Sequence, residues 1–249
     1  MDNSLLVSLS QQLAAFRSMD VIANNLANVS TPGYKREAAR FEEYIAQVAP
    51  GEGQSGPQTL SFVRDAGTER DLGEGDIRHT GAPLDFAVNG DGYFVVQTPA
   101  GMRYTRDGHF TLDENGQMET SEGYPVQGDG GAITITPDDG DITVGKDGTI
   151  SSIINGNANQ IGKLQVVDFV NDAGLTDQGS NLYSTTQAPV TPTATVEQGM
   201  LESSNVKPVI EISHMLEVMR AYQMTAALSN SQESLIRQAI SQLGSMPTS

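Results

Sequence analysis

Glycine is distributed very unevenly along this chain, and that distribution limits the folds that the chain can adopt. Of the 26 glycines, all but Gly33, Gly199 and Gly244 lie between residues 51 and 179. Glycine weakens helices and is favoured in tight turns. We therefore expect a turn-rich β region in the middle of the chain, with helices on either side of it.

The first residues predict a long amphipathic helix. Apolar side chains recur at spacings of three and four, which places them on one helical face. Thr31-Pro32-Gly33 should end the helix, because proline disfavours helical geometry in the residue before it and Pro-Gly suits a turn. The apolar stripe consists of Leu5, Leu9, Leu13, Phe16, Met19, Ala23 and Leu26.

The last residues predict a second amphipathic helix with a heptad-like seam. Ser204 or Asn205 suits its N-cap, Pro208 its first turn and Gly244 its end. The seam, which Ser229 and Glu233 weaken in the middle, consists of Ile212, Met215, Met219, Tyr222, Ala226, Ser229, Glu233, Ile236, Ile240 and Leu243.

Between the helices, short alternating runs separated by glycine turns predict antiparallel β structure. Leu84–Val88 and Tyr93–Val96 flank Asn89-Gly90-Asp91-Gly92, which suggests a hairpin, and Asn-Gly or Asp-Gly recurs at 107–108, 115–116, 147–148 and 155–156. The predicted fold class is a mainly β central domain, a hairpin-rich sandwich or irregular barrel, flanked by long N- and C-terminal helices that pair as a coiled coil on assembly.

These patterns divide the chain into five segments. Polar stretches rich in Gly, Pro and Thr read as connections between the periodic parts. The expected segments are a helix with its Pro-Gly turn at 1–34, an extended linker at 35–82, a β-rich domain at 83–184, a return linker at 185–204 and the C-terminal helix at 205–249.

Charge excludes several classes of partner. The chain has 14 Lys+Arg and 31 Asp+Glu, a net charge of −17, and residues 65–150 carry 17 acidic and 5 basic residues, or −12. A surface this acidic repels phosphate backbones, so we expect no nucleic-acid partner. The sequence contains no apolar run long enough for membrane insertion and no typical secretory signal. We expect a cytoplasmic chain or one exported without a cleaved signal.

The sequence offers little for catalysis or metal binding. The absence of cysteine excludes disulfides, thiol chemistry and zinc–thiolate sites. The three histidines lie in three different predicted segments without metal-ligand spacing, and the acidic turns lack the ligand spacing of an EF-hand. We therefore expect no enzyme, no cofactor and no metal site.

The terminal helices have two kinds of possible partner. Their stripes could be buried inside one chain, by pairing with each other or by packing on the β region. They could instead pack against neighbouring subunits, because both helices lie at chain ends outside the β block, and helices draw most of their stability from packing. The periodicity alone leaves both possibilities open.

Several blocks of residues, in order along the chain, resemble the axial rod and hook proteins of the bacterial flagellum. Together they span nearly the whole chain, with one departure at Gln223, where the family usually has an acidic residue. The blocks are Asn24–Lys35 (NNLANVSTPGYK), Leu84–Phe94, Tyr104–Phe110, Gly123–Val126, Gln198–Val206 and Arg220–Tyr222.

Within that family, the chain resembles the proximal rod subgroup. Its length is short for a hook protein, and the run Ile142–Ile150 followed by Ile161–Leu164 is similar to this subgroup. The nearest alternative is a distal rod or hook subunit. A secreted β-domain adhesin or a wall hydrolase fits less well, because no spaced pair of acidic residues recommends hydrolysis.

The resemblance implies a structural subunit of the flagellar basal-body rod. Such a protein is exported unfolded from the cytoplasm through the flagellar type III apparatus and assembles in the periplasm with other rod proteins and copies of itself. Its terminal helices form the inner tube and its β domain faces outward.

The expected assembly surface lies on the two terminal helices. Asn24, Asn25 and Asn28 would supply hydrogen bonds that fix register, or else mark where the helix frays before its turn. The expected surface consists of Leu5, Leu9, Leu13, Phe16, Ile22, Asn24, Asn25, Leu26, Asn28, Ile212, Met215, Met219, Tyr222, Ile236 and Ile240.

Overall fold

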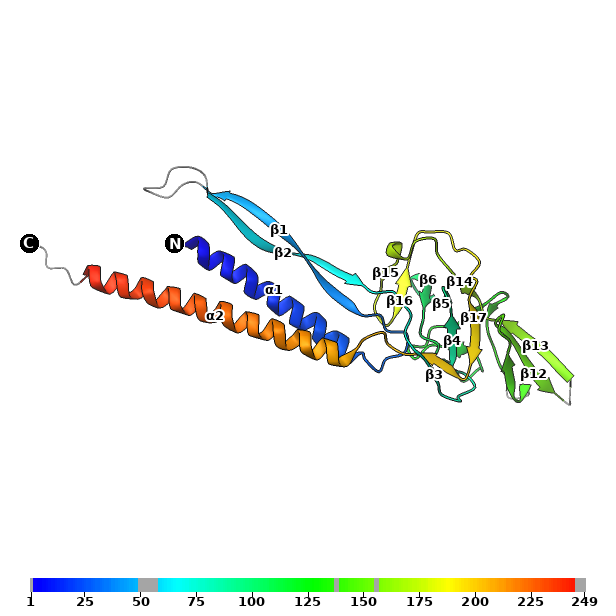
Figure 1. The fold of residues 1–249 in the computed structure, drawn as a ribbon. Helices are drawn as coiled ribbons and strands as arrows, with labels where there is room; N and C mark the ends of the chain where they lie inside the picture. Colours follow the sequence, from blue (N-terminus) through cyan, green and yellow to red (C-terminus); the bar gives the residue numbers. More distant parts are fainter. Residues whose placement is uncertain (1, 49–57, 137–138, 155–156, 245–249) are drawn as a thin grey trace, which may run out of the picture. The chain divides into compact units, whose positions relative to one another are not determined.

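The computed structural model of the chain describes residues 2–48, 58–136, 139–154 and 157–244 (Figure 1). The chain separates into two compact units. The helical unit comprises residues 1–27, 37–71 and 207–249, and the β-rich unit comprises residues 28–36 and 72–206. The expected order of helix, strand-rich centre and helix is confirmed.

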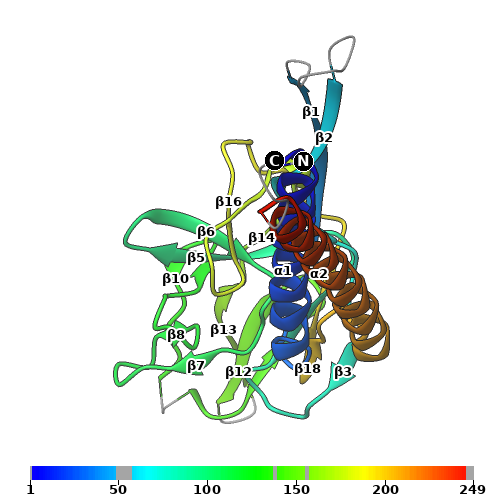
Figure 2. The ribbon, with the colours of Figure 1, turned by 90° about the vertical axis from the view of Figure 1, so that its left-hand side faces the viewer.

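The helical unit consists of two helices and a two-stranded hairpin. Helix α1 (Asp2–Ala27) and helix α2 (Pro208–Gly244) lie side by side in both views (Figures 1 and 2). They run antiparallel, because Phe16 contacts Tyr222 while Asn25 contacts Glu211. The two helices therefore already pair within a single chain.

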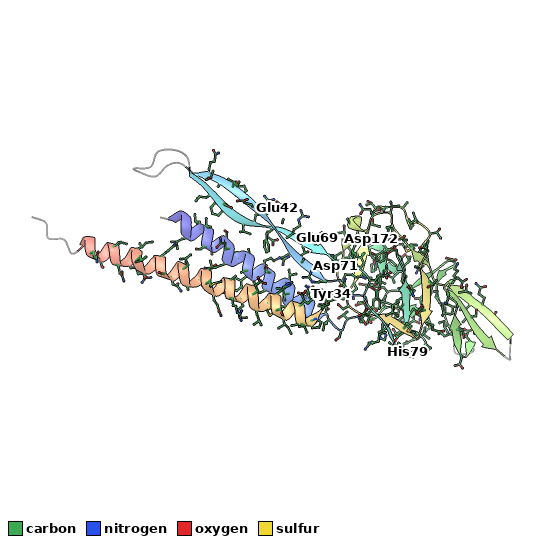
Figure 3. All side chains as sticks on the ribbon, viewed as in Figure 1. Tyr34, Glu42, Glu69, Asp71, His79 and Asp172 are labelled. Carbon is green, nitrogen blue, oxygen red and sulfur yellow. The ribbon has the colours of Figure 1, made fainter. Side chains whose placement is uncertain are left out.

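A long hairpin occupies much of the range expected to be an extended linker, 35–82. Strands β1 (Glu37–Val48) and β2 (Gln58–Arg70) pair in antiparallel register with a bulge at Arg40/Phe41. Helix α1 contacts β2 through Ser10 and Arg17, whose partners are the Val63 amide and Asp65. The sequence did not reveal the hairpin because charged side chains alternate irregularly along it, among them the labelled Glu42 and Glu69 in Figure 3.

The β-rich unit is built from short antiparallel strands. Its largest sheet has the order β14-β5-β6-β16-β15, and the described residues form no closed barrel. The elements are β3 (Ile77–His79), β4 (Phe86–Asn89), β5 (Tyr93–Thr98), β6 (Gly101–Thr105), β7 (Thr111–Leu112), β8 (Met118–Glu119), β9 (Gln127–Gly128), β10 (Gly131–Ala132), β11 (Ile142–Val144), β12 (Thr149–Ile154), β13 (Asn157–Lys163), β14 (Val166–Val167), the 3-10 turn η2 (Asp172–Gly174), β15 (Thr176–Asp177), β16 (Leu182–Ser184), β17 (Thr195–Gln198) and β18 (Met200–Glu202).

Strand β5 is buried on both of its faces. Phe94 and Val96 point into the larger apolar cluster, where Phe94 packs edge-on against Phe110. Tyr93 and Val95 point the other way, into a second cluster with Phe169 and Tyr183. Because side chains alternate between the faces of a strand, this one strand anchors both cores.

The hairpin expected around residues 89–92 does not form. Strands β4 and β5 join different sheets: β4 pairs with β17, whereas β5 pairs with β6 and β14. Gly90 still provides the left-handed turn, with φ +100. Hairpins do turn at 115–116 and 147–148. Residues 107–108 instead connect β6 to β7, which pair with other strands, and His109 just after them bridges Asp85. Residues 155–156 fall outside the described residues.

Helix α2 begins later than either expected N-cap. Its first residue is Pro208, as its missing N–H allows, and its last is Gly244, as predicted. The Ser204 hydroxyl accepts a hydrogen bond from the Val206 amide, and the Asn205 side chain contacts Arg36 and Gly73. Asn205 therefore belongs to the β-rich unit and does not cap the helix.

Candidate assembly surface

Helix α1 presents an exposed apolar stripe. Leu9, Leu13 and Phe16 are 51%, 60% and 48% exposed, and Leu6, which the sequence interpretation missed, extends the stripe with a side chain 51% exposed. The spacing of three and four places all of them along one line of the helix. Leu5 and Leu26 are half-buried and Ile22 is buried, so these three residues pack inside the unit.

Helix α2 divides its apolar residues between a covered seam and exposed flanks. Met215, Tyr222 and Ile236 are half-buried and share one side of the helix, because they are spaced by multiples of seven residues. On this side, Tyr222 contacts the Phe16 ring of α1 at a centroid distance of 4.8 Å. Nine other large apolar residues of the described part of this helix are exposed. The exposed members are Val209, Ile210, Ile212, Leu216, Met219, Met224, Leu228, Leu235 and Ile240.

Such an amount of exposed aliphatic surface on two helices is unusual for a chain that functions alone. Single exposed apolar residues are ordinary, but contiguous stripes mark interaction sites. We call the exposed apolar residues of α1 and α2 together the helical stripes. The helical periodicity of the sequence could have identified Leu6, Leu216 and Leu228 as apolar surface residues. Periodicity cannot show which of several apolar faces of a helix a neighbouring element covers.

The three asparagines expected to fix subunit register lie in different surroundings. Asn25 is fully buried; its Nδ2 donates to the Glu37 carbonyl at 2.7 Å and to Glu211 Oε2 at 3.3 Å, and its Oδ1 accepts from the Glu37 amide at 2.9 Å. Asn28 Oδ1 accepts from the Thr31 hydroxyl at 3.2 Å in the turn after α1. Asn24 is exposed. Asn25 thus joins α1, β1 and α2 within one chain.

A buried group of charges lies in the β-rich unit. Lys35 Nζ donates to Glu202 Oε1 at 2.6 Å, and an Arg106 guanidinium nitrogen donates to Glu202 Oε2 at 3.4 Å. Burial lowers the pKa of Lys35, and the Glu202 carboxylate opposes that shift. Burial also raises the pKa of Tyr93, whose ring lies 5.0 Å from the Arg106 guanidinium. The sequence blocks contain these residues, but nothing local in the sequence brings them together.

One carboxyl in this region titrates unusually high. Burial raises the pKa of Asp107 to about 6, and the His109 backbone amide, which donates to Asp107 Oδ1 at 3.0 Å, opposes the shift. His109 itself contacts Asp85, with 2.7 Å between Nδ1 and Oδ1. The folded unit therefore holds a proton on Asp107 at a pH where the unfolded chain has released it.

We expect Asp107→Asn to flatten the pH dependence of stability between pH 5 and pH 7.5. The raised folded-state pKa gives a stabilisation that is fully present below about pH 4 and is lost as the pH rises through about 6. Wild type should gain about 1 kcal/mol relative to the variant on going from pH 7.5 to pH 5, measured by urea unfolding. Asp113→Asn is the control, because hydrogen bonds lower the pKa of that carboxyl; equal profiles for wild type and Asp107→Asn would contradict the assignment.

Comparison with known proteins places these features in one family. Residues 5–35 match "Flagella basal body rod protein", residues 87–152 match "Flagellar hook protein FlgE/F/G D1 domain", and residues 197–243 match "Flagellar basal body rod FlgEFG protein C-terminal". The flagellar basal-body rod protein FlgF of Caulobacter vibrioides is 41% identical over 98% of this chain and 99% of that protein. The chain belongs to the flagellar basal-body rod protein family.

Two other relatives agree with this assignment. FlgF of Mesorhizobium japonicum is 36% identical over 98% of this chain and 99% of its own. FlgG of Buchnera aphidicola subsp. Schizaphis graminum is 38% identical over 91% of this chain and 94% of that protein. As a rod protein of FlgF type, the chain is a structural component of the flagellar basal body. Neither of its described helices is both long and apolar enough to cross a membrane.

Proposed function

We propose that this rod protein is a subunit of the proximal rod and assembles through its helical stripes with copies of itself and with other rod proteins. The observation that carries the proposal is the exposed line Leu6, Leu9, Leu13 and Phe16 on α1, matched by exposed aliphatic residues along α2. Burying these side chains against neighbours supplies the driving force for association.

The distribution of charge favours this mode of association. Residues 1–44 carry 5 acidic and 4 basic residues, and residues 197–249 carry 5 acidic and 3 basic residues, so neither terminal segment repels its like strongly. The acidic excess lies on residues 65–150, mostly in the β-rich unit. Head-to-tail contacts whose rotation does not close generate a helical filament, and a rod is such a filament.

The remaining parts of the proposal follow from the family. The chain would leave the cytoplasm unfolded through the flagellar type III apparatus and take its place in the periplasmic part of the basal body, with the β-rich unit outward and with a mechanical role in place of a catalytic one. The absence of cysteine suits passage into an oxidising compartment, where stray disulfides would trap the chain.

Two glutamates placed on the α1 stripe should abolish rod assembly without unfolding the chain. Leu9→Glu combined with Leu13→Glu changes two side chains that are more than half exposed, so the free energy of unfolding should change by about 0.5 kcal/mol or less. Expressed in a strain lacking the wild-type gene, the variant should give no rods by electron microscopy of basal bodies, and colonies should not spread in soft agar.

The matched control is Gln11→Glu, which adds a charge to an exposed position of the same helix outside the stripe. It should restore spreading to the wild-type diameter. Swimming by the Leu9→Glu/Leu13→Glu strain would contradict the proposed surface.

The position along the rod has its own test. Basal bodies from a strain that lacks this gene should show neither distal rod nor hook if the subunit is proximal. Basal bodies that retain a short rod and lack only its outer part would instead identify a distal subunit.

A further inference from the structure

We propose that Lys35, Glu202 and Asn205 form a polar clamp, here called the junction clamp, that ties together the chain segments leaving the β-rich unit so that they share mechanical load. The proposal rests on the proposed function as a rod subunit. It assigns a mechanical role to residues that lie outside the helical stripes.

The chain passes between its two units four times. The β-rich unit takes residues 28–36 and 72–206, so the crossings follow residues 27, 36, 71 and 206. A force applied to one unit reaches the other through these covalent crossings. If only one crossing were taut, it would carry the whole force, and the first hydrogen bonds to break would be those beside it.

Lys35 lies just before the second crossing and binds the segments at the third and fourth crossings. Its ammonium is fully buried and donates to the Gly73 carbonyl at 2.8 Å as well as to Glu202. Gly73 follows the third crossing and Glu202 precedes the fourth. One side chain thus links the segments around residues 35, 73 and 202.

Asn205 makes a second set of links among the same segments. Its Oδ1 accepts from the Arg36 amide at 2.7 Å, and its Nδ2 donates to the Gly73 carbonyl at 3.0 Å. Its backbone amide donates to the Tyr34 carbonyl at 3.4 Å. Tyr34, which is labelled in Figure 3, is itself buried.

Glu202 connects the clamp to the core. Its Oε1 also accepts from the Gly75 amide at 2.8 Å, and its backbone carbonyl accepts from the Gly33 amide at 2.9 Å. Its Oε2 meets Arg106, whose guanidinium lies over the Tyr93 ring of β5. Force on the segments is therefore passed to the strand that is buried in both cores.

The chemistry suits a joint better than it suits simple stability. A buried ion group is seldom more stabilising than an apolar group of the same volume, because its charges must leave water. Its hydrogen bonds, however, have fixed directions and lengths, so the segments cannot slide past one another. Glu202 is also shared by two cations, so replacing it leaves two buried positive charges without their common partner.

The test compares Glu202→Gln and the milder Asn205→Ala with Glu197→Gln in the full-length chain. Glu197 lies on neighbouring β17 and accepts a hydrogen bond from Asn89 in an exposed setting, so its loss controls for the removal of one carboxylate. Hydrogen exchange of the purified chains should accelerate at least tenfold at residues 31–36, 73–75 and 202–206 in the two clamp variants. Exchange in β5 should stay within threefold of wild type for Asn205→Ala.

The second readout is motor behaviour under load, which a merely stabilising role would not change selectively. Cells that carry Asn205→Ala should assemble rods in normal number and rotate a small bead at wild-type speed. With a large bead or in viscous medium, they should stop or lose rotation at less than half of the wild-type torque. Glu197→Gln cells should match wild type at every load.

Each other outcome has a definite meaning. Unchanged exchange at the three segments, normal torque at high load, or failure of the folded Asn205→Ala chain to assemble would overturn the clamp while leaving the rod assignment intact. If Glu202→Gln does not fold, Asn205→Ala alone decides. Normal swimming by a strain without the gene would instead overturn the proposed function.

Discussion

Replacing Asn25 by alanine should lower the free energy of unfolding of the helical unit by about 3 kcal/mol, because its buried carboxamide joins three elements. The change leaves the amide and carbonyl of Glu37 and the buried carboxylate of Glu211 without their contacts to this side chain. A buried polar group left unpaired costs about 1–3 kcal/mol, and some of that cost is recovered by relaxation.

Asn25→Asp should be at least as damaging as Asn25→Ala. An aspartate keeps the acceptor for the Glu37 amide but loses both donors, and it places a second carboxylate beside buried Glu211. The measurement is urea unfolding followed by helical circular dichroism. The control is Asn24→Ala, an exposed neighbour on the same helix. Equal urea midpoints for Asn24→Ala and Asn25→Ala would show that the buried carboxamide does not hold the three elements together.

Replacing Gly33 by alanine should destabilise the β-rich unit by at least about 3 kcal/mol, through two effects that a control can separate. Gly33 has φ +66, a region that costs an L-residue roughly 1–2 kcal/mol. A Cβ built there would also lie 2.6 Å from the Arg106 carbonyl carbon and from the Asp107 amide nitrogen. Both contacts are with backbone, which cannot rotate away.

The control for Gly33→Ala is Gly131→Ala, in the same unit. Gly131 has φ +110, and an added Cβ would meet nothing within 4 Å, so this variant reports backbone strain without a clash. Thermal unfolding followed by tyrosine fluorescence should show a clearly larger loss for Gly33→Ala, since the chain has 7 tyrosines and no tryptophan. Similar losses in the two variants would mean that the turn does not sit tightly on residues 106–107.

The sequence predicted those parts of the molecule that repeat locally. Leu9, Leu13 and Phe16 were placed on a helical face by spacing alone, and the structure leaves that face exposed. The glycine turns at 115–116 and 147–148 were likewise readable, because their dipeptides favour the backbone that such hairpins need. The contribution of Leu9, Leu13 and Phe16 to subunit contacts remains a prediction.

The long-range polar contacts could not be predicted in the same way. The sequence suggested that Asn25 fixes the register between subunits and that Asn205 caps a helix. In the structure, each residue joins segments that are far apart in the same chain. Lys35 and Glu202 are far apart in the sequence, so no local periodicity predicts that they form an ion pair. The hairpin of β1 and β2 was missed for a related reason: most of its side chains meet solvent, so burial imposes little alternation on them.

The bulge in that hairpin has a consequence for how the protein tolerates changes in length. Arg40 pairs with Gly67 but Phe41 pairs with Asp65, so Ala66 is an extra residue that offsets the two halves of the ribbon by one position. Adding or removing one residue between Asp65 and Arg70 would shift the pairing of Glu37–Arg40 relative to the other half of the ribbon, where Val63 and Asp65 contact α1. Residues added to the chain between Val48 and Gln58 would leave this phase unchanged, so a change of length there should keep the contacts of β2 with α1.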